Sequence, residues 1–350
     1  MAGSMRASEL IWHCLLGQPV TPPADDEARH AASEFAARLA RRLSPSLMQY
    51  LLEPLRPELP GSANALLLSR LSYAAQKSAW MRLEAAGLEP VALKGFANAH
   101  RLYDDPVPRI VGDLDVLLER RHLATAIGLL AREGFRFAPI TDKRWGLIGD
   151  ASFAPFHSVD GVCNIDFHIQ PDSWPLPLGL TADDVRSRAR HVAGVRMPSD
   201  ESALLIAVAN AAKDKFGWRT LGKALDLSRL LHITSGSLDW DEVRHRARAA
   251  RLEPAMGTFF SLLRELGGEA PDMASPNGVV FRGLVEEWQS GFVDDPGDFT
   301  TLAREALLAH TAKTALALNV RRLSGLLTPY DGVPPEGRAF AYGDARSRQT

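Results

Sequence analysis

The chain has 350 residues, of which 46% are hydrophobic and 23% are charged, and its formal net charge is −2. The length allows two packed domains, and the proportions exclude disordered, collagen-like and coiled-coil classes. A nearly neutral charge argues against a protein that coats nucleic acid or an anionic membrane. The two cysteines, Cys14 and Cys163, are too few and too far apart for a disulfide framework or a clustered zinc site.

The first 23 residues and the longest apolar run bear on location. The N-terminal stretch lacks a long apolar core followed by a small-residue cleavage site, and the run ALLIAVANAA is too short to span a bilayer. With so little cysteine, a reducing compartment fits. We therefore expect a cytoplasmic protein without a membrane partner.

Hydrophobic periodicity changes twice along the chain. Residues 26–43 and 62–86 carry apolar side chains at helical spacing, which predicts an N-terminal helical segment over residues 1–87. Short apolar runs then alternate with helical patterns over residues 88–198, which predicts an α/β core. From residue 199 to about 328 the pattern is helical again, and residues 329–350 have the composition of a flexible tail. The predicted fold class is α+β.

Within the core, the runs are short and bounded by turn residues. The Asp160-Gly161 pair between two strand-like runs predicts a hairpin, and Gly134 marks the end of a helix. Ser199 or Asp200 is expected to cap the next helix. The predicted strands are residues 90–95, 112–119, 135–140, 152–159, 162–170 and 190–197, and the predicted helices are 96–105, 121–134, 199–213, 219–233, 238–250, 254–266 and 301–323.

Two aspartates lie inside the apolar run VPRIVGDLDVLLERR. In a strand, Asp113 and Asp115 project from the same face about 6 to 7 Å apart, and each raises the pKa of the other unless a cation compensates. Mg²⁺ is the natural cation, because it binds through one or two carboxylates together with substrate phosphates. The alternative is that the pair is simply the solvated face of an edge strand.

Three further positions support the functional reading. Lys94 and Gly95 end a strand-like run ahead of a helix, where backbone amides and an ammonium group can receive phosphate oxygens. They can equally be a solvated lysine and an ordinary turn glycine. Arg109 precedes the acidic strand and can hold a phosphate or pin one of the aspartates.

A third carboxylate comes from the run VCNIDFHIQ, in which Asn164, Asp166 and His168 share one face of a strand. If this strand lies beside the Asp113 strand, three carboxylates converge. Asp166 would then serve as metal ligand and general base toward an acceptor hydroxyl. The alternative is a polar strand face with cross-strand hydrogen bonds, and we expect His168 to support the site rather than to bind metal.

The run ALKGFANAHRLYDDPVPRIVGDLDVLL, followed by EGFRF and NIDFHI, resembles the bacterial nucleotidyltransferase family 5 of the DNA polymerase beta-like superfamily. The likeness covers roughly residues 65 to 270. It implies a small mixed sheet flanked by helices and Mg²⁺, as two ions and with Mn²⁺ as an alternative, on Asp113, Asp115 and Asp166. It also implies an NTP donor such as ATP, whose α-phosphate is attacked in line by an acceptor hydroxyl while pyrophosphate leaves.

Lys94, Gly95 and Arg109 match motif positions of that family, although the wider superfamily has a Gly-Ser turn where this chain has Lys94-Gly95-Phe96. In the helical half, Lys213 and Asp226 are predicted nucleotide or acceptor contacts. The alternative at those two positions is a solvated lysine and an aspartate that either ends a helix or is buried and paired.

Missing motifs and local charge narrow the function further. The chain has no phosphate-binding loop of the NTPase type, no dinucleotide fingerprint, no serine nucleophile elbow and no His-Glu-x-x-His zinc motif. Between residues 181 and 251 thirteen Lys and Arg face nine Asp and Glu, which would admit an RNA end or another anionic acceptor. The second hypothesis is a protein that keeps the fold as a catalytically inactive nucleotide-binding or scaffold protein.

Overall fold

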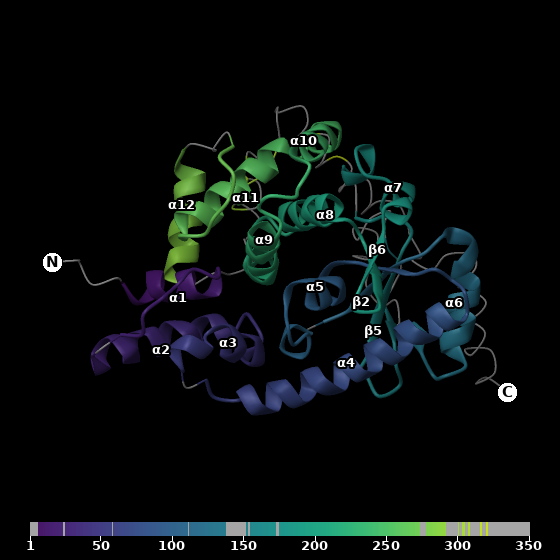
Figure 1. The fold of residues 1–350 in the computed structure, drawn as a ribbon, viewed down its shortest axis with the longest axis horizontal. Coiled ribbons are helices and arrows are strands. Elements are labelled where there is room, and N and C mark those ends of the chain that lie inside the picture. The colour runs from purple at the N-terminus through teal and green to yellow at the C-terminus, as the bar shows by residue number, and fades with distance from the viewer. Residues whose placement is uncertain are drawn as a thin grey trace. The chain divides into compact units, whose positions relative to one another are not determined.

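The structure is a computed structural model that describes residues 6–23, 25–57, 59–110, 112–137, 152, 155–172, 175–273 and 278–291, with a few positions between 300 and 320. Within these ranges the chain is an α+β protein with a five-stranded mixed sheet and a separate two-stranded sheet (Figure 1). The predicted tail at 329–350, most of the predicted helix at 301–323 and parts of the strands predicted at 135–140 and 152–159 lie outside the described residues.

The chain divides into two compact units. One comprises the residues up to Ser69 together with Ala207–Ala315, and the other consists chiefly of Arg70–Ile206. The divisions fall within helices α4 (Ser62–Ala85) and α8 (Asp200–Lys213). Helical segments from both ends of the chain therefore belong to one unit. The domain boundaries predicted at residues 87, 198 and 328 stay predictions.

The helical unit is held together by contacts between its first and its later helices. Trp12 stacks on Trp288 with ring centroids 5.9 Å apart, and its indole donates to the Trp288 carbonyl at 3.1 Å. Periodicity predicted α2, α9, α10 and α11 but did not single out α1, α3 and α12. The helices of this unit are α1 (Ala7–Leu15), α2 (Asp26–Ala40), α3 (Pro45–Leu51), α9 (Leu221–Ile233), α10 (Trp240–Ala249), α11 (Glu253–Glu265) and α12 (Val279–Ser290).

The α/β unit is built on the five-stranded sheet, whose order is β1-β2-β5-β4-β3. β2 and β5 run parallel, and the other neighbouring pairs run antiparallel. The strands are β1 (Val91–Ala92), β2 (Leu114–Leu117), β3 (Arg136–Phe137), β4 (Phe156–His157) and β5 (Asn164–His168), and the main helices besides α4 are α5 (Lys94–Leu102), α6 (Leu123–Ala131) and α7 (Ala182–Ser187). The mixed sheet flanked by helices is confirmed.

Alternation along the two central strands places the core on one side of the sheet. Leu114 and Val116 of β2 and Ile165 and Phe167 of β5 are fully buried and join one apolar cluster with side chains from α4, α5 and α6. Burying one such side chain contributes about 1.5 to 3 kcal/mol. The residues between them on each strand must therefore face the opposite side.

Two hairpins connect neighbouring antiparallel strands. The hairpin predicted at Asp160-Gly161 is confirmed, since β4 and β5 pair antiparallel across it. The single strand predicted over residues 190–197 is wrong, because this segment forms the hairpin β6 (Arg190–Val192) and β7 (Val195–Met197). Ala193 and Gly194 both have positive φ, 49° and 77°, as a two-residue hairpin turn requires. Alanine seldom adopts that conformation, so the turn left no clear mark in the sequence.

No helix within the described part of the chain is both long enough and apolar enough to cross a lipid bilayer.

Candidate active site

The register between β2 and β5 brings two acidic side chains together. Asp115 lies directly opposite Asp166 in this parallel pair, and two residues further along Leu117 lies opposite His168. Figure 1 shows the two strands side by side. Partners in a parallel pair project from the same face, so both carboxylates lie on the face opposite Leu114 and Ile165. The strand that carries Asp166 thus lies beside the strand that carries Asp115, which is the condition for their carboxylates to converge.

Lys94 links these strands to the start of α5. Its ammonium Nζ lies 2.8 Å from Asp115 Oδ1 and 3.5 Å from His168 Nε2, and His168 Nε2 lies 2.8 Å from the same Asp115 oxygen. The Leu93 amide donates to the Asp115 carbonyl at 2.9 Å, which fixes the entry of α5 against β2. The side chains of Lys94 and Asp115 are only 19% and 13% exposed. The three groups form a compact, largely buried network.

Charge and burial oppose each other in this network. Burial alone would raise the pKa of Asp115, but Lys94 and then His168 outweigh it and hold that pKa well below its usual range. Burial alone would lower the pKa of Lys94, whereas Asp115 and Asp172 raise it above its ordinary value. Burial, followed by the Lys94 charge, lowers the pKa of His168. At neutral pH the network therefore holds an ammonium, a carboxylate and a neutral imidazole.

Lys94 also has an unusual backbone. It is the first residue of α5, yet its φ is 49°, in the left-handed region that favours glycine. A non-glycine residue held in that region costs on the order of 1 to 3 kcal/mol, and such strain is often found at functional sites. The helix begins two residues before the predicted start at residue 96. As a result Lys94 and Gly95 lie in its first turn and not, as predicted, at the end of the preceding strand.

Asp113 precedes β2 and differs from Asp115 in its surroundings. It is exposed, and its Oδ1 accepts a hydrogen bond from the side-chain amide of Asn164 on β5. Neighbouring protein atoms still exclude part of its water and raise its pKa; the Asn164 bond opposes this shift and Asp115 adds to it. The turn before it is anchored from α4, where buried Gln76 donates to the Gly112 carbonyl at 2.8 Å. Asn164 thus makes a cross-strand hydrogen bond, as expected if this face of β5 is a polar strand face.

Gly95 and Arg109 lie together at the start of α5. Arg109 ends a short 3₁₀ turn, Val107–Arg109, and is buried with 8% exposure. A Cβ placed on Gly95 would lie 3.7 Å from one guanidinium nitrogen of Arg109, which is ordinary contact. An alanine at Gly95 would therefore fit the protein, so steric fit alone does not require a glycine. Their predicted phosphate contacts stay predictions.

The two candidate contacts from the helical half, Lys213 and Asp226, belong to the helical unit. Lys213 is exposed at the end of α8, and Asp226 is buried within α9. Near them, Asp214 forms an ion pair with Lys223. The predicted roles of Lys213 and Asp226 in substrate binding stay predictions.

Two members of this network, together with Asp166, form a donor set suited to a divalent cation. One ligand atom from each of Asp115, Asp166 and His168 lies within 4.8 Å of the others. Ionised carboxylates suit Mg²⁺ and Mn²⁺, whereas imidazole is the ligand of Zn²⁺ and other transition metals. The two carboxylates therefore fit the implied metal. Asp113 is not part of that group, so its predicted role as a ligand stays a prediction.

The sequence did not single out Asp172 or Gln76, and it indicated only a supporting role for His168. Asp172 is 2% exposed and acts electrostatically on Lys94 and His168, but it follows β5 in a turn and no motif marks it. Gln76 lies 36 residues from the turn that it anchors. His168 shares the Asp166 face, which its spacing of two residues already indicated, and it contacts both Lys94 and Asp115.

A five-stranded mixed sheet with acidic side chains on two adjacent parallel strands is consistent with a nucleotidyltransferase fold. The profile of the uncharacterised nucleotidyltransferase family matches residues 33–268, about two thirds of the chain. The chain belongs to this family, and transfer of a nucleotidyl group is the general chemistry that membership supports. Among curated proteins and solved structures, none matches the chain.

Proposed function

We propose that the protein is a Mg²⁺-dependent nucleotidyltransferase that moves an NMP from an NTP to an acceptor hydroxyl. The acceptor oxygen forms a bond to the α-phosphorus, the bond from that phosphorus to the bridging oxygen of the β-phosphate breaks, and pyrophosphate leaves with the bonding electrons. The observation that carries the proposal is the register that sets Asp115 opposite Asp166 in a chain of this family.

Each side chain of the site has a role that its surroundings support. Asp115 stays ionised because Lys94 and His168 lower its pKa, so at neutral pH it has the charge that a metal ligand needs. Asp166 is a second ligand and accepts the proton of the acceptor hydroxyl. Asp113, which is exposed and hydrogen-bonded to Asn164, completes the carboxylate set. When bound, Mg²⁺ supplies charge that stabilises the attacking and leaving oxygens.

The triphosphate is expected at the start of α5. The first amides of a helix have no acceptor within the helix, and the positive end of the helix dipole favours anions. Lys94, Gly95 and Arg109 are gathered there, which offers two cationic side chains beside a residue without a side chain. This arrangement supports their assignment as substrate contacts in place of the Gly-Ser turn of the wider superfamily.

The test combines a labelled donor with separated acceptors. Purified protein with Mg²⁺ is incubated with each of the four NTPs labelled at the α-phosphate, and with the small-molecule, RNA and protein fractions of a cell extract. We expect label to move onto one fraction. The same NTP labelled at the γ-phosphate should leave no label on the acceptor, because that phosphate departs with pyrophosphate. Label from the γ-position would identify a kinase instead.

Two variants and a matched control assign the activity to the site. Asp113→Asn and Asp166→Asn should each lower transfer by about 100-fold or more, the usual loss when an electrostatic contact to the transition state is removed. Asp183→Asn, an exposed aspartate of α7 in the same unit, should leave transfer unchanged. Full activity in both site variants would refute the assignment. Calorimetry that detects NTP binding by a protein with no transfer in any fraction would favour the inactive nucleotide-binding alternative.

A further inference from the structure

The ammonium group of Lys94 lies among the atoms that would bind a metal. The candidate ligand atoms of Asp115, Asp166 and His168 lie within 4.8 Å of one another. Lys94 Nζ is 2.8 Å from Asp115 Oδ1 and 3.5 Å from His168 Nε2. The Asp115 carboxylate is therefore already paired with a positive charge, and that charge belongs to a side chain of the protein itself.

A divalent ion and this ammonium exclude each other. Both need the Asp115 carboxylate, and at ligand distance from it the two cations would stand a few ångström apart. Lys94 and Asp115 are 19% and 13% exposed, so little water is present to screen the repulsion. For the ion to bind with its full affinity, the ammonium has to move away from Asp115.

The position of Lys94 at the start of α5 lets its ammonium reach an anion bound there. Lys94 is the first residue of α5, where the helix start favours an anion, and its flexible side chain is a mobile point charge. Arg109 lies beside the same turn and adds positive charge to it. A triphosphate bound there would offer the ammonium a phosphate oxygen in exchange for Asp115.

We propose that Lys94 is an internal cation that closes the carboxylate site to free divalent ions until a triphosphate draws its ammonium away. This inference rests on the proposed function, since it takes the Asp115 and Asp166 site to be a metal site for nucleotide transfer. It adds an order of events: metal binds weakly to the protein alone and tightly together with the nucleotide. Lys94 is then a positioning residue that couples the two ligands.

The experiment measures Mn²⁺ binding without any nucleotide, by the electron paramagnetic resonance signal of the free ion. Lys94→Met should bind Mn²⁺ at least about tenfold more tightly than the wild type, because a neighbouring charge changes ionic equilibria by about 10- to 1000-fold. Lys77→Met removes an exposed lysine of α4 in the same unit and should match the wild type. The double variant Lys94→Met with Asp166→Asn should lose the gain, which would locate the tighter binding at the carboxylates.

The outcomes separate the inference from the proposed function. Equal or weaker Mn²⁺ binding by Lys94→Met would overturn the inference, while nucleotide transfer by the wild type would still stand. If neither the wild type nor Lys94→Met binds Mn²⁺, the metal site itself is wrong and both proposals fail. If Asp166→Asn leaves the gain of Lys94→Met intact, the ion binds elsewhere and the inference is also refuted.

Folding of the variants is checked separately. The melting temperature of Lys94→Met should rise on addition of Mn²⁺ by more than that of the wild type, since the ion replaces the lost positive charge. Lys94→Gln keeps a hydrogen-bond donor for Asp115 without the charge, and it should show the same gain in Mn²⁺ affinity. If neither variant folds even with Mn²⁺ present, the ammonium is a structural counter-ion that the metal cannot replace, and the proposal is overturned.

Discussion

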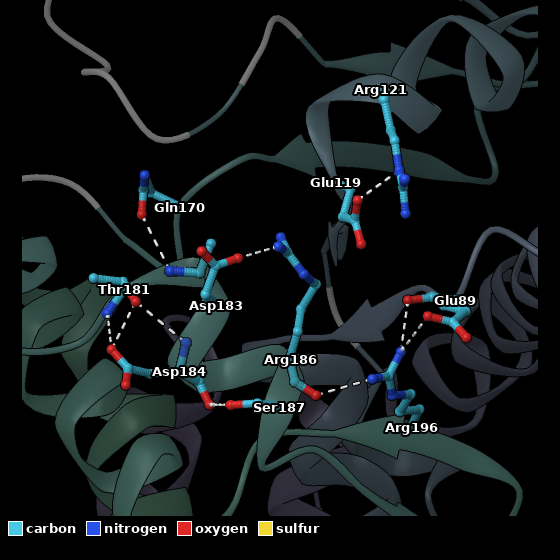
Figure 2. Close-up of polar contacts among 11 residues, drawn as sticks. Glu89, Glu119, Arg121, Gln170, Thr181, Asp183, Asp184, Arg186, Ser187 and Arg196 are labelled. Atoms are coloured by element: carbon cyan, nitrogen blue, oxygen red, sulfur yellow. Dashed lines mark hydrogen bonds and ion pairs between the residues drawn. The ribbon is translucent and has the colours of Figure 1, made fainter.

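The α/β unit contains two groups of charged side chains that are paired in different ways. Near α7 and the β6–β7 hairpin, Figure 2 shows the ion pairs of Asp183 with Arg186 and of Arg196 with Glu89, and both carboxylates are exposed. The Asp183 side chain is 87% exposed. In the candidate active site, Lys94 and Asp115 are 19% and 13% exposed and share His168. Burial of the carboxylate, and not the number of ion pairs, distinguishes the two groups.

The Asp183–Arg186 pair and the buried network also differ in the sequence distance that they span. Asp183 and Arg186 are three residues apart on one helix, so any chain that forms α7 brings them together. Lys94 and His168 are 74 residues apart and meet only when β1, β2 and β5 have assembled. The Asp183–Arg186 pair is a consequence of local structure, whereas the buried network requires the completed sheet. Breaking the buried network should therefore destabilise the unit far more.

The largest effect is expected for Asp115→Asn. This change leaves the Lys94 ammonium largely buried without its negative partner, and loss of one member of a buried ion pair costs about 3 kcal/mol or more. The free energy of unfolding, measured by urea denaturation in EDTA, should fall by that amount. A loss below about 1 kcal/mol would place this pair with exposed surface pairs and would contradict the comparison.

The same distinction explains what the sequence predicted and what it did not. Periodicity placed β2 and β5, since Leu114, Val116, Ile165 and Phe167 alternate with polar residues, and the Asp-Gly turn placed the β4–β5 hairpin. The spacing of Asp115 and Asp166 on their strands then indicated that the two carboxylates would meet once the strands were neighbours. These signals are local and regular, so they could be read without the fold.

The contacts that complete the site depend on tertiary structure. Gln76 reaches the Gly112 carbonyl from α4, and Asp172 acts on Lys94 from a turn, and neither position has a periodic or motif signal. The left-handed backbone of Lys94 and of Ala193 is equally hidden, because neither residue type favours positive φ. The sequence therefore indicated which strands carry acids but not that a lysine would neutralise one of them.

The stability of the buried network should also depend on pH, through His168. Burial and Lys94 lower the pKa of His168 in the folded state, so the unfolded chain binds a proton there first as the pH falls. Stability from this group is complete above the unfolded pKa of about 6.5 and is lost below it. Between about pH 7.5 and 5.5 the loss is at most about 1.4 kcal/mol from this side chain.

Two variants show which histidine causes this loss of stability at lower pH. His168→Gln should flatten the dependence of the unfolding free energy on pH over this range. His100 is a second histidine whose pKa is lowered, by burial and then by Lys77, and His100→Gln should remove a separate part of the slope. Denaturation curves at several pH values measure both contributions. If the slope is the same in the wild type and in both variants, neither histidine is buried in its neutral form as the structure indicates.

A smaller effect separates the charge of Lys94 from its backbone. Lys94→Ala and Lys94→Gly both remove the ammonium, but only glycine adopts a φ of 49° without strain. The glycine variant should therefore be the more stable of the two by about 0.5 to 1 kcal/mol, although glycine is normally the poorer residue in a helix. Comparison of the two by urea denaturation isolates this term. A more stable alanine variant would show that the backbone at residue 94 is not left-handed in solution.

The smallest effect is expected at the surface, for Asp183→Asn. Its pair with Arg186 is one helical turn apart and 87% exposed on the acidic side, so water solvates the carboxylate whether or not the pair forms. The helix start does not depend on it, because Thr181 and the neighbouring Asp184 form the capping box of α7. The unfolding free energy should therefore change by no more than about 0.5 kcal/mol. A change as large as that of Asp115→Asn would mean that surface pairs contribute as much as the buried network, and the distinction between the two groups would be lost.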